Sequence, residues 1–208
     1  MVFTLYAFYN DVFISVNVLK LHKYFMLLAK KITTSLACAC FYYVAFTFNR
    51  FIFDEYAFSF GVHWVFIPSG LQLVLVLTAV EEAALGIAIA SWLIGFQYYY
   101  LESDLNTIIT GIITGASPLL ARKISFDFLH IEDDLKNLTF KSILLMSVIF
   151  ALLSATLHQL WFFYNHVSDQ FLNNLLVMFI GNLTGTVMVL VFIKAASGLL
   201  KGQNSPIE

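Results

Sequence analysis

The sequence predicts an all-α, polytopic membrane protein: a bundle of six transmembrane helices with the N-terminus and the C-terminus in the cytoplasm. Hydrophobic residues make up 60% of the 208 residues and charged residues only 12%. In soluble domains roughly a quarter of the residues are charged. In addition, long charge-free runs divide the chain, and the basic residues between them alternate in a way that defines two sides of a membrane.

Six charge-free runs follow Lys31, and each is long enough to cross a lipid bilayer once. A transmembrane helix needs about 20 apolar residues, with a range of about 17 to 25. The runs are 32–49, 56–80, 83–101, 105–121, 142–168 and 170–193. We therefore expect a transmembrane domain over 32–200 and a short tail over 201–208.

The orientation follows from the Lys and Arg residues, which concentrate in cytoplasmic loops. If Lys31 is cytoplasmic, alternate loops place ten of the eleven Lys and Arg residues inside and only Arg50 outside. The bias supports both the number of spans and cytoplasmic termini. It is typical of a multi-pass protein of the bacterial inner (cytoplasmic) membrane. The longest loop, 122–141, is expected to lie along the membrane surface as a partly helical connector.

The N-terminal segment 1–31 has two interpretations. It is fairly apolar but carries Asn10 and Asp11, followed by several Lys residues, a composition that fits an interfacial helix on the cytoplasmic face. Alternatively the start codon is misplaced and the chain begins at Met26, where MLLAKK precedes an apolar run. The intact mass of the native protein distinguishes the two.

Polar residues inside the spans gather in the half that this topology places outside. Unpaired polar groups are costly in hydrocarbon, so they should face one another or water within the bundle. They either join helices and form an interfacial aromatic belt, or line an outward-facing cavity that binds a small molecule. The candidate ligand-binding residues are His63, Trp64, Ser69, Gln72, Gln97, Asn106, His158, Asn173 and Asn182.

Metal or cofactor binding is not predicted. His63, His158 and His166 all fall toward the outer side, but no pair has the i, i+4 spacing of ligands on one helix. Cys38 and Cys40 are too few for a metal cage and too close along one helix for a disulfide.

Glycines mark the expected contacts between helices. A Pro68-Ser69-Gly70 break opens the second apolar run, and two G-x-x-x-G patterns permit close approach of helix backbones. The predicted helix-packing positions are Gly70, Gly111, Gly115, Gly181 and Gly185.

Some of these segments resemble the membrane-associated sensor domains of the MASE type. Pro68-Ser69-Gly70-Leu71 opens a long apolar helix, and Gly86 and Trp92-Leu93-Ile94-Gly95 follow one helix later. The pattern Gly181-Asn182-Leu183-Thr184-Gly185 is similar to the closing helix of that family. The resemblance covers roughly residues 64–194 and implies a membrane domain that senses a signal.

The chain also departs from the family pattern. Ile67 stands where the family has Trp, and Asn182 stands where it has Asp. Family members commonly have about eight spans and are joined to a cytoplasmic histidine kinase or cyclic-dinucleotide enzyme. We therefore expect a stand-alone domain whose output passes through a separate protein.

Two functions remain open at this stage. The first is a non-enzymatic integral membrane sensor or small-ligand-binding domain that signals to a cytoplasmic partner. The alternative is a transport component, such as the substrate-binding subunit of an energy-coupling-factor transporter with an ATPase partner. Such subunits are similar in size, span number and orientation, and Ala84 and Ala88 form a small-xxx-small pair for a partner helix.

Other classes have less support. Ser117 and His158 resemble a hydrolase pair, but the topology places them at opposite ends of their helices, too far apart for proton transfer. No nucleic acid is expected as a partner, because the basic residues follow the membrane surface. The sequence identifies the lipid bilayer as a partner but leaves the small molecule unknown and the oligomeric state open, a homo-oligomer included.

Overall fold

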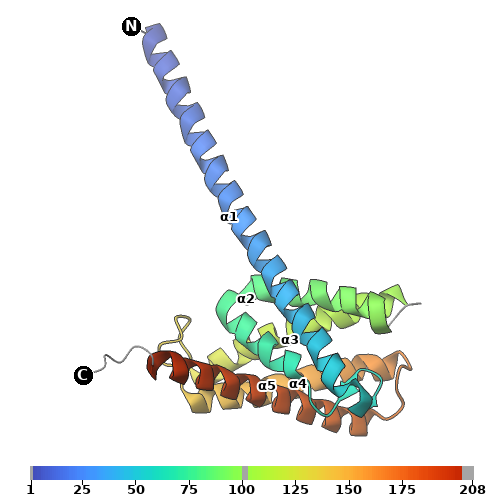
Figure 1. Cartoon of the computed structure of the whole chain (residues 1–208). Coiled ribbons are helices and arrows are strands. Elements are labelled where there is room, and N and C mark those ends of the chain that lie inside the picture. Colours follow the sequence, from blue (N-terminus) through green and yellow to red (C-terminus); the bar gives the residue numbers. More distant parts are fainter. Residues whose placement is uncertain (1, 100–102, 203–208) are drawn as a thin grey trace.

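The computed structural model describes residues 2–99 and 103–202, and side chains over 20–99 and 103–197. The described part is mostly helical, with a two-stranded antiparallel hairpin between the first two helices (Figure 1). The elements in order are α1 (Val2–Phe53), η1 (Asp54–Tyr56), β1 (Ala57–Ser59), β2 (Val62–His63), α2 (Ile67–Ile94), η2 (Gly95–Tyr99), α3 (Asp104–Leu129), α4 (Phe140–Tyr164) and α5 (Phe171–Gly202).

Four of these helices are long and apolar enough to cross a membrane, which supports a multi-pass membrane protein. They lie within Lys20–Tyr56, Ile67–Tyr99, Phe140–Tyr164 and Phe171–Ser197. Helix α3 has 26 residues but includes charges at both ends and several Ser and Thr residues. The structure therefore has five long helices among the described residues, where the sequence predicted six separate spans.

The difference lies in α2, which contains the two predicted spans 56–80 and 83–101 in part and is kinked between them. Ala79 (φ −127°, ψ 17°) and Val80 (φ 30°, ψ −100°) depart from helical geometry. The Thr78 hydroxyl donates to the carbonyl oxygens of Val74 and Leu75, 3.1 and 2.9 Å away. Hydroxyl bonding to the preceding turn bends helices. At the kink the chain turns back on itself (Figure 1).

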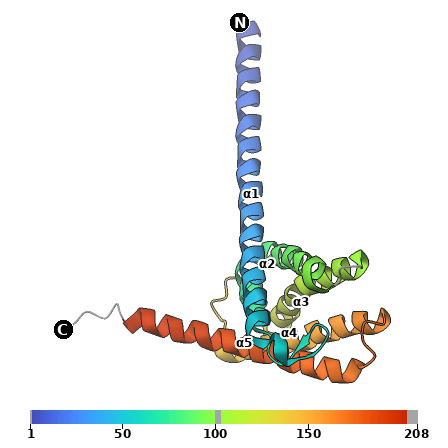
Figure 2. The same cartoon turned by 45° about the vertical axis from the view of Figure 1, so that its right-hand side comes forward.

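Helix α1 is continuous through residue 31 and projects beyond the bundle at its N-terminal end (Figure 2). Its C-terminal half packs against the other helices through one face. The buried residues of that face follow helical spacing: Ser35, Cys38, Ala39, Tyr42, Phe46 and Asn49. The predicted boundary at residue 31 thus falls inside one helix, close to where packing begins.

Another segment approaches closely at each of the five glycines singled out in the sequence: a helix at Gly70, Gly111 and Gly115, and β2 or the start of α2 at Gly181 and Gly185. A Cβ at Gly185 would lie 1.9 Å from the carbonyl oxygen of Phe66, and one at Gly181 would lie 2.1 Å from that of His63. A side chain at Gly70 would meet Val189, while Gly111 and Gly115 are covered by α2. Because backbone atoms cannot yield, only glycine fits at 181 and 185 in this packing.

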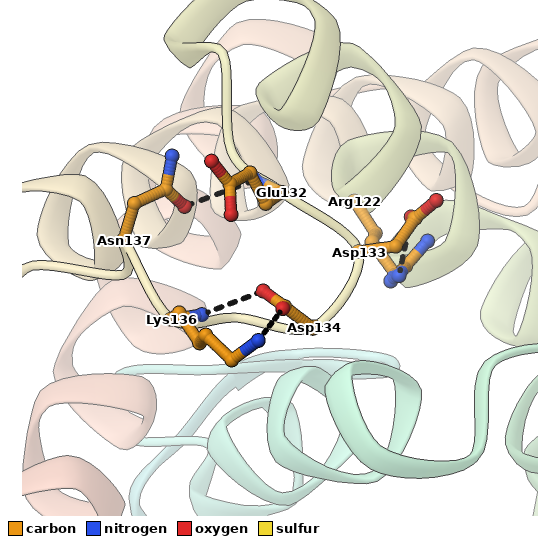
Figure 3. A network of polar contacts seen from close by, with 6 residues as sticks. All are labelled: Arg122, Glu132, Asp133, Asp134, Lys136 and Asn137. Carbon is orange, nitrogen blue, oxygen red and sulfur yellow. Dashed lines mark hydrogen bonds and ion pairs between the residues drawn. The ribbon is translucent and has the colours of Figure 1, made fainter.

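The connector between α3 and α4 is shorter than predicted, because α3 continues to Leu129. The remaining loop is held by polar contacts among its own residues and with Arg122 of α3 (Figure 3). Arg122 forms an ion pair with Asp133 at 3.4 Å, Asp134 pairs with Lys136, and the Glu132 N–H donates to Asn137 Oδ1 at 2.9 Å. Hydrogen bonding from Lys136 lowers the pKa of Asp134. The loop is therefore an ordered turn.

Candidate ligand-binding cavity

The hairpin before α2 delivers His63 to the interior of the bundle. After β2 the chain lies against α5, where the Phe66 N–H donates to the Gly181 carbonyl at 3.1 Å. Pro68 stands in the first turn of α2, where its missing N–H has no cost. The Pro68-Ser69-Gly70 break is therefore the start of a helix rather than a defect within one.

A partly open cavity lies between the helices, bordered by residues from α1 through α5. The volume open to the centre of a water molecule is about 80 Å³. Aromatic and small polar side chains line it, and none of the described lining residues is Asp, Glu, Lys or Arg. The lining residues are Tyr42, Phe46, Gly61, His63, Phe66, Gln72, Ser91, Ile94, Gly95, Tyr99, Thr107, Thr110, Thr114, Ser154, His158, Phe162, Met178 and Asn182.

Four of the nine candidate residues come together at this cavity: His63, Gln72, His158 and Asn182. All four are at most 6% exposed. They come from β2, the first half of α2, α4 and α5, so they are distant in sequence and adjacent in the fold. Tyr42 of α1 lies within hydrogen-bonding reach of Gln72.

The other five candidates do not line the cavity. Ser69 lies behind it, with its hydroxyl 2.6 Å from the Asn182 carbonyl oxygen. Trp64 is 46% exposed, and its ring packs edge-on against Phe58. Gln97, Asn106 and Asn173 also lie outside the lining; Asn173 is exposed and Gln97 accepts a hydrogen bond from Tyr43.

A hydrogen-bonded chain runs along one wall of the cavity. The Ser91 hydroxyl donates to Thr114 Oγ1 at 3.2 Å, and Thr114 Oγ1 lies 3.1 Å from His158 Nε2. His158 Nδ1 lies 2.8 Å from the Ser154 carbonyl oxygen. A carbonyl oxygen only accepts, so Nδ1 carries a proton, and in the neutral ring Nε2 is an acceptor facing the Thr114 hydroxyl. The single proton of that hydroxyl is shared between Nε2 and the Thr110 carbonyl oxygen, which lies 2.7 Å from Thr114 Oγ1.

Other polar atoms at the cavity have no partner among the described residues. They are His63 Nδ1, Thr110 Oγ1 and Asn182 Nδ2. Asn182 is 2% exposed, so bulk water does not satisfy its amide. A buried donor without an acceptor costs about 1–3 kcal/mol, and native structures satisfy most such groups with protein, water or ligand atoms. The cavity therefore offers unused hydrogen-bonding capacity.

His63 differs from His158 in its surroundings. Its ring stacks on Phe66 with the centroids 6.1 Å apart and the planes at 18°. Burial lowers the pKa of His63, an effect that the nearby Asp54 carboxylate partly opposes. Asp54 itself is paired with Arg50 at 3.0 Å. Neutral His63 is thus the form that the fold favours.

Some lining residues were missed at the sequence level although a signal was present. Thr107, Thr110 and Thr114 follow one another at helical spacing, i, i+3 and i+7, and so share one face of α3. All three line the cavity. Ser117, which resembled the nucleophile of a hydrolase, instead donates to the Ile113 carbonyl at 2.6 Å. Thr114 takes the position beside His158.

Metal ligands do not assemble in the part of the chain that the structure describes: no group of three His, Cys, Asp or Glu residues is placed to hold an ion.

No protein-family model, curated protein or solved structure matches the chain. The start of α2 lies against the middle of α5. Ser69 contacts Asn182 and Thr186 in the last helix, and Gly70 approaches Gly185.

Proposed function

We propose that the protein is a non-enzymatic membrane sensor that binds a small molecule in this cavity. The unpartnered Nδ2 of Asn182 carries the proposal, because it is buried, belongs to the helix that resembles the closing helix of the sensor domains, and borders the cavity. Small-molecule sites commonly combine apolar and aromatic walls with a few polar groups, as this cavity does.

We further propose that the chain crosses the bacterial inner membrane six times, with both halves of the kinked α2 counted as passes. Glu81 and Glu82 directly follow the kink, and Nζ of Lys31 in α1 lies 3.6 Å from Oε1 of Glu82. Glu81 shares a surface hollow with Arg122 and Lys123 of α3. Such a cluster of charges belongs at the cytoplasmic surface. The cavity then faces outward.

The two halves of α2 connect the cavity to that surface. Gln72 from the first half and Ser91 from the second border the same cavity, while the halves join at Ala79 and Val80. A ligand that favours one angle between the halves shifts the population of kink geometries, provided that its affinity differs between them. The charges at the kink and the N-terminal half of α1 are then the surface that a separate cytoplasmic partner reads.

The sequence feature offered for the transport alternative was the small pair Ala84 and Ala88, which could contact a partner helix. In this fold the pair packs against Gly115 of α3. A Cβ added at Gly115 would lie 2.4 Å from the Ala84 carbonyl oxygen and 2.9 Å from the Ala88 Cβ. Copurification of an ATPase subunit with the native protein would favour transport over sensing.

A thermal-shift screen tests the proposed function. The purified full chain in lipid nanodiscs is screened against vitamins, sugars, phosphorylated metabolites and metal ions. We expect one class to raise the Tm with increasing concentration, as mass action requires. The response should be lost in His158→Ala and Asn182→Ala and kept in Asn173→Ala, a control at an exposed position of the same helix as Asn182. If both cavity variants respond like the wild type, the site assignment is wrong.

A further inference from the structure

The lining of the cavity restricts the charge of its ligand. No described lining residue has a charged side chain, and near His63 the oppositely charged Arg50 and Asp54 pair with each other. An ion moved from water into such an environment lacks a counter-charge and is strongly disfavoured. The cavity therefore selects against both carboxylates and ammonium groups.

The walls of the cavity restrict the shape of the ligand. Phe46 meets Phe66 and Tyr99 edge-on, with ring centroids 6.3 and 6.0 Å apart and interplanar angles of 75° and 73°. All three rings border the cavity, and aromatic rings pair favourably with another flat ring both edge to face and offset-stacked. Aromatic walls also attract organic cations, but a cation would meet the unpartnered N–H groups of Asn182 with the wrong polarity.

The size of the cavity and its unpartnered polar atoms restrict the ligand further. A volume of 80 Å³ open to water centres holds roughly six water molecules at about 10–15 Å³ each, a space that suits a single ring with one substituent. Asn182 Nδ2 needs an acceptor, and the Thr110 hydroxyl lacks a partner among the described residues. A primary amide offers an acceptor and a donor together.

We infer that the cavity takes a small, uncharged, planar molecule made of one ring with a carbonyl or carboxamide group. Its carbonyl oxygen accepts from Asn182, its ring packs among Phe46, Phe66 and Phe162, and its remaining donor reaches Thr110 or His63. This inference rests on the proposed ligand-binding function and specifies the class of ligand. No covalent step is involved.

The test uses four probes that share one ring and differ in charge and hydrogen bonding: benzamide, benzoate, benzylammonium and ethylbenzene. Each is titrated against the full chain in nanodiscs, and the Kd is obtained from the rise in Tm. We expect benzamide to bind at least about tenfold more tightly than each of the others, because a buried polar group left unpaired discriminates strongly against ligands that lack its partner.

Two variants connect the preference to Asn182. Asn182→Leu keeps a similar volume without the amide and should bind benzamide no better than ethylbenzene. Asn182→Asp keeps the shape, adds a negative charge and should shift the preference to benzylammonium. Asn173→Asp, at an exposed position of the same helix, controls for added charge and should keep the wild-type order.

The inference is overturned if benzoate, benzylammonium or ethylbenzene binds as tightly as benzamide, or if no probe binds. It is also overturned if benzamide binding is unchanged in Asn182→Leu. The proposed function is judged separately by the broad screen: a compound of another class whose effect depends on His158 and Asn182 would keep the function and discard this ligand class.

Discussion

Asn49 near the end of α1 accepts a hydrogen bond, 2.9 Å long, from the backbone N–H of Ile67, the first residue of α2. The first N–H groups of a helix have no partner within it. In α2, Pro68 has no N–H to satisfy, and the Ser69 N–H donates to the Phe66 carbonyl. A side chain of one span thus caps the next and positions the chain that carries His63.

Replacing this cap should destabilise the protein. In Asn49→Leu the Ile67 N–H loses its acceptor in a buried position, since Asn49 is 1% exposed. We expect a loss of about 1–2 kcal/mol of unfolding free energy. Denaturant titration followed by helical circular dichroism measures it. Thr47→Val, at an exposed position two residues earlier in α1, is the control; equal effects for the two variants would contradict the capping role.

Gly185 should tolerate no side chain. In Gly185→Ala the new Cβ would lie 1.9 Å from the Phe66 carbonyl oxygen, so α5 must move away from the start of α2. Overpacking costs about 1–3 kcal/mol, which exceeds the gain of about 1 kcal/mol from replacing glycine in a helix. The Tm should therefore fall.

Thr184→Ala, the adjacent position on the same helix, controls for a change of side chain without the backbone clash, and its Tm should stay close to that of the wild type. A Gly185→Ala protein as stable as Thr184→Ala would show that the two backbones are not in contact.

The long helices were predictable because membrane spans require uninterrupted apolar runs, and the structure has apolar helices over most of the predicted ones. The kink in α2 was not predictable in the same way. No Pro or Gly marks Ala79 and Val80, and the Thr78 hydroxyl bonds that accompany the bend depend on a rotamer that a sequence does not display. Glu81 and Glu82, which separate the predicted spans 56–80 and 83–101, are helical and directly follow the kink.

The sequence indicates how deep along the helices the polar residues lie, but not which of them point into the cavity. A polar residue within an apolar run is expected to face the interior of the bundle, and both His158 and Asn182 are buried there. Asn173 and Asn174 lie at the same depth, yet successive residues point about 100° apart around a helix. Asn174 is buried and bonded to Ser59, while Asn173 is exposed. Composition alone does not distinguish such neighbours.

Thr114 should be the residue that keeps His158 satisfied. In Thr114→Val the shape is nearly kept, but His158 Nε2 and the Ser91 hydroxyl both lose the partner shown at 3.1 and 3.2 Å. We expect a loss of about 1–3 kcal/mol of unfolding free energy. Thr114→Ser restores the hydroxyl and should recover most of it. If Ser and Val at 114 are equally destabilising, the methyl group matters rather than the hydrogen bond.

His63 should make stability depend on pH. Burial lowers its pKa in the folded protein, whereas in the unfolded chain it titrates near its ordinary value of about 6.5. Below that value the unfolded chain binds the proton more readily, so this contribution to stability is complete above about pH 6.5 and is lost as the pH falls toward the folded pKa. The Tm measured between about pH 8 and pH 5 should decrease less in His63→Gln than in the wild type. His130→Gln, at an exposed position after α3, controls for removal of one imidazole, and a wild-type slope in His63→Gln would contradict the assignment.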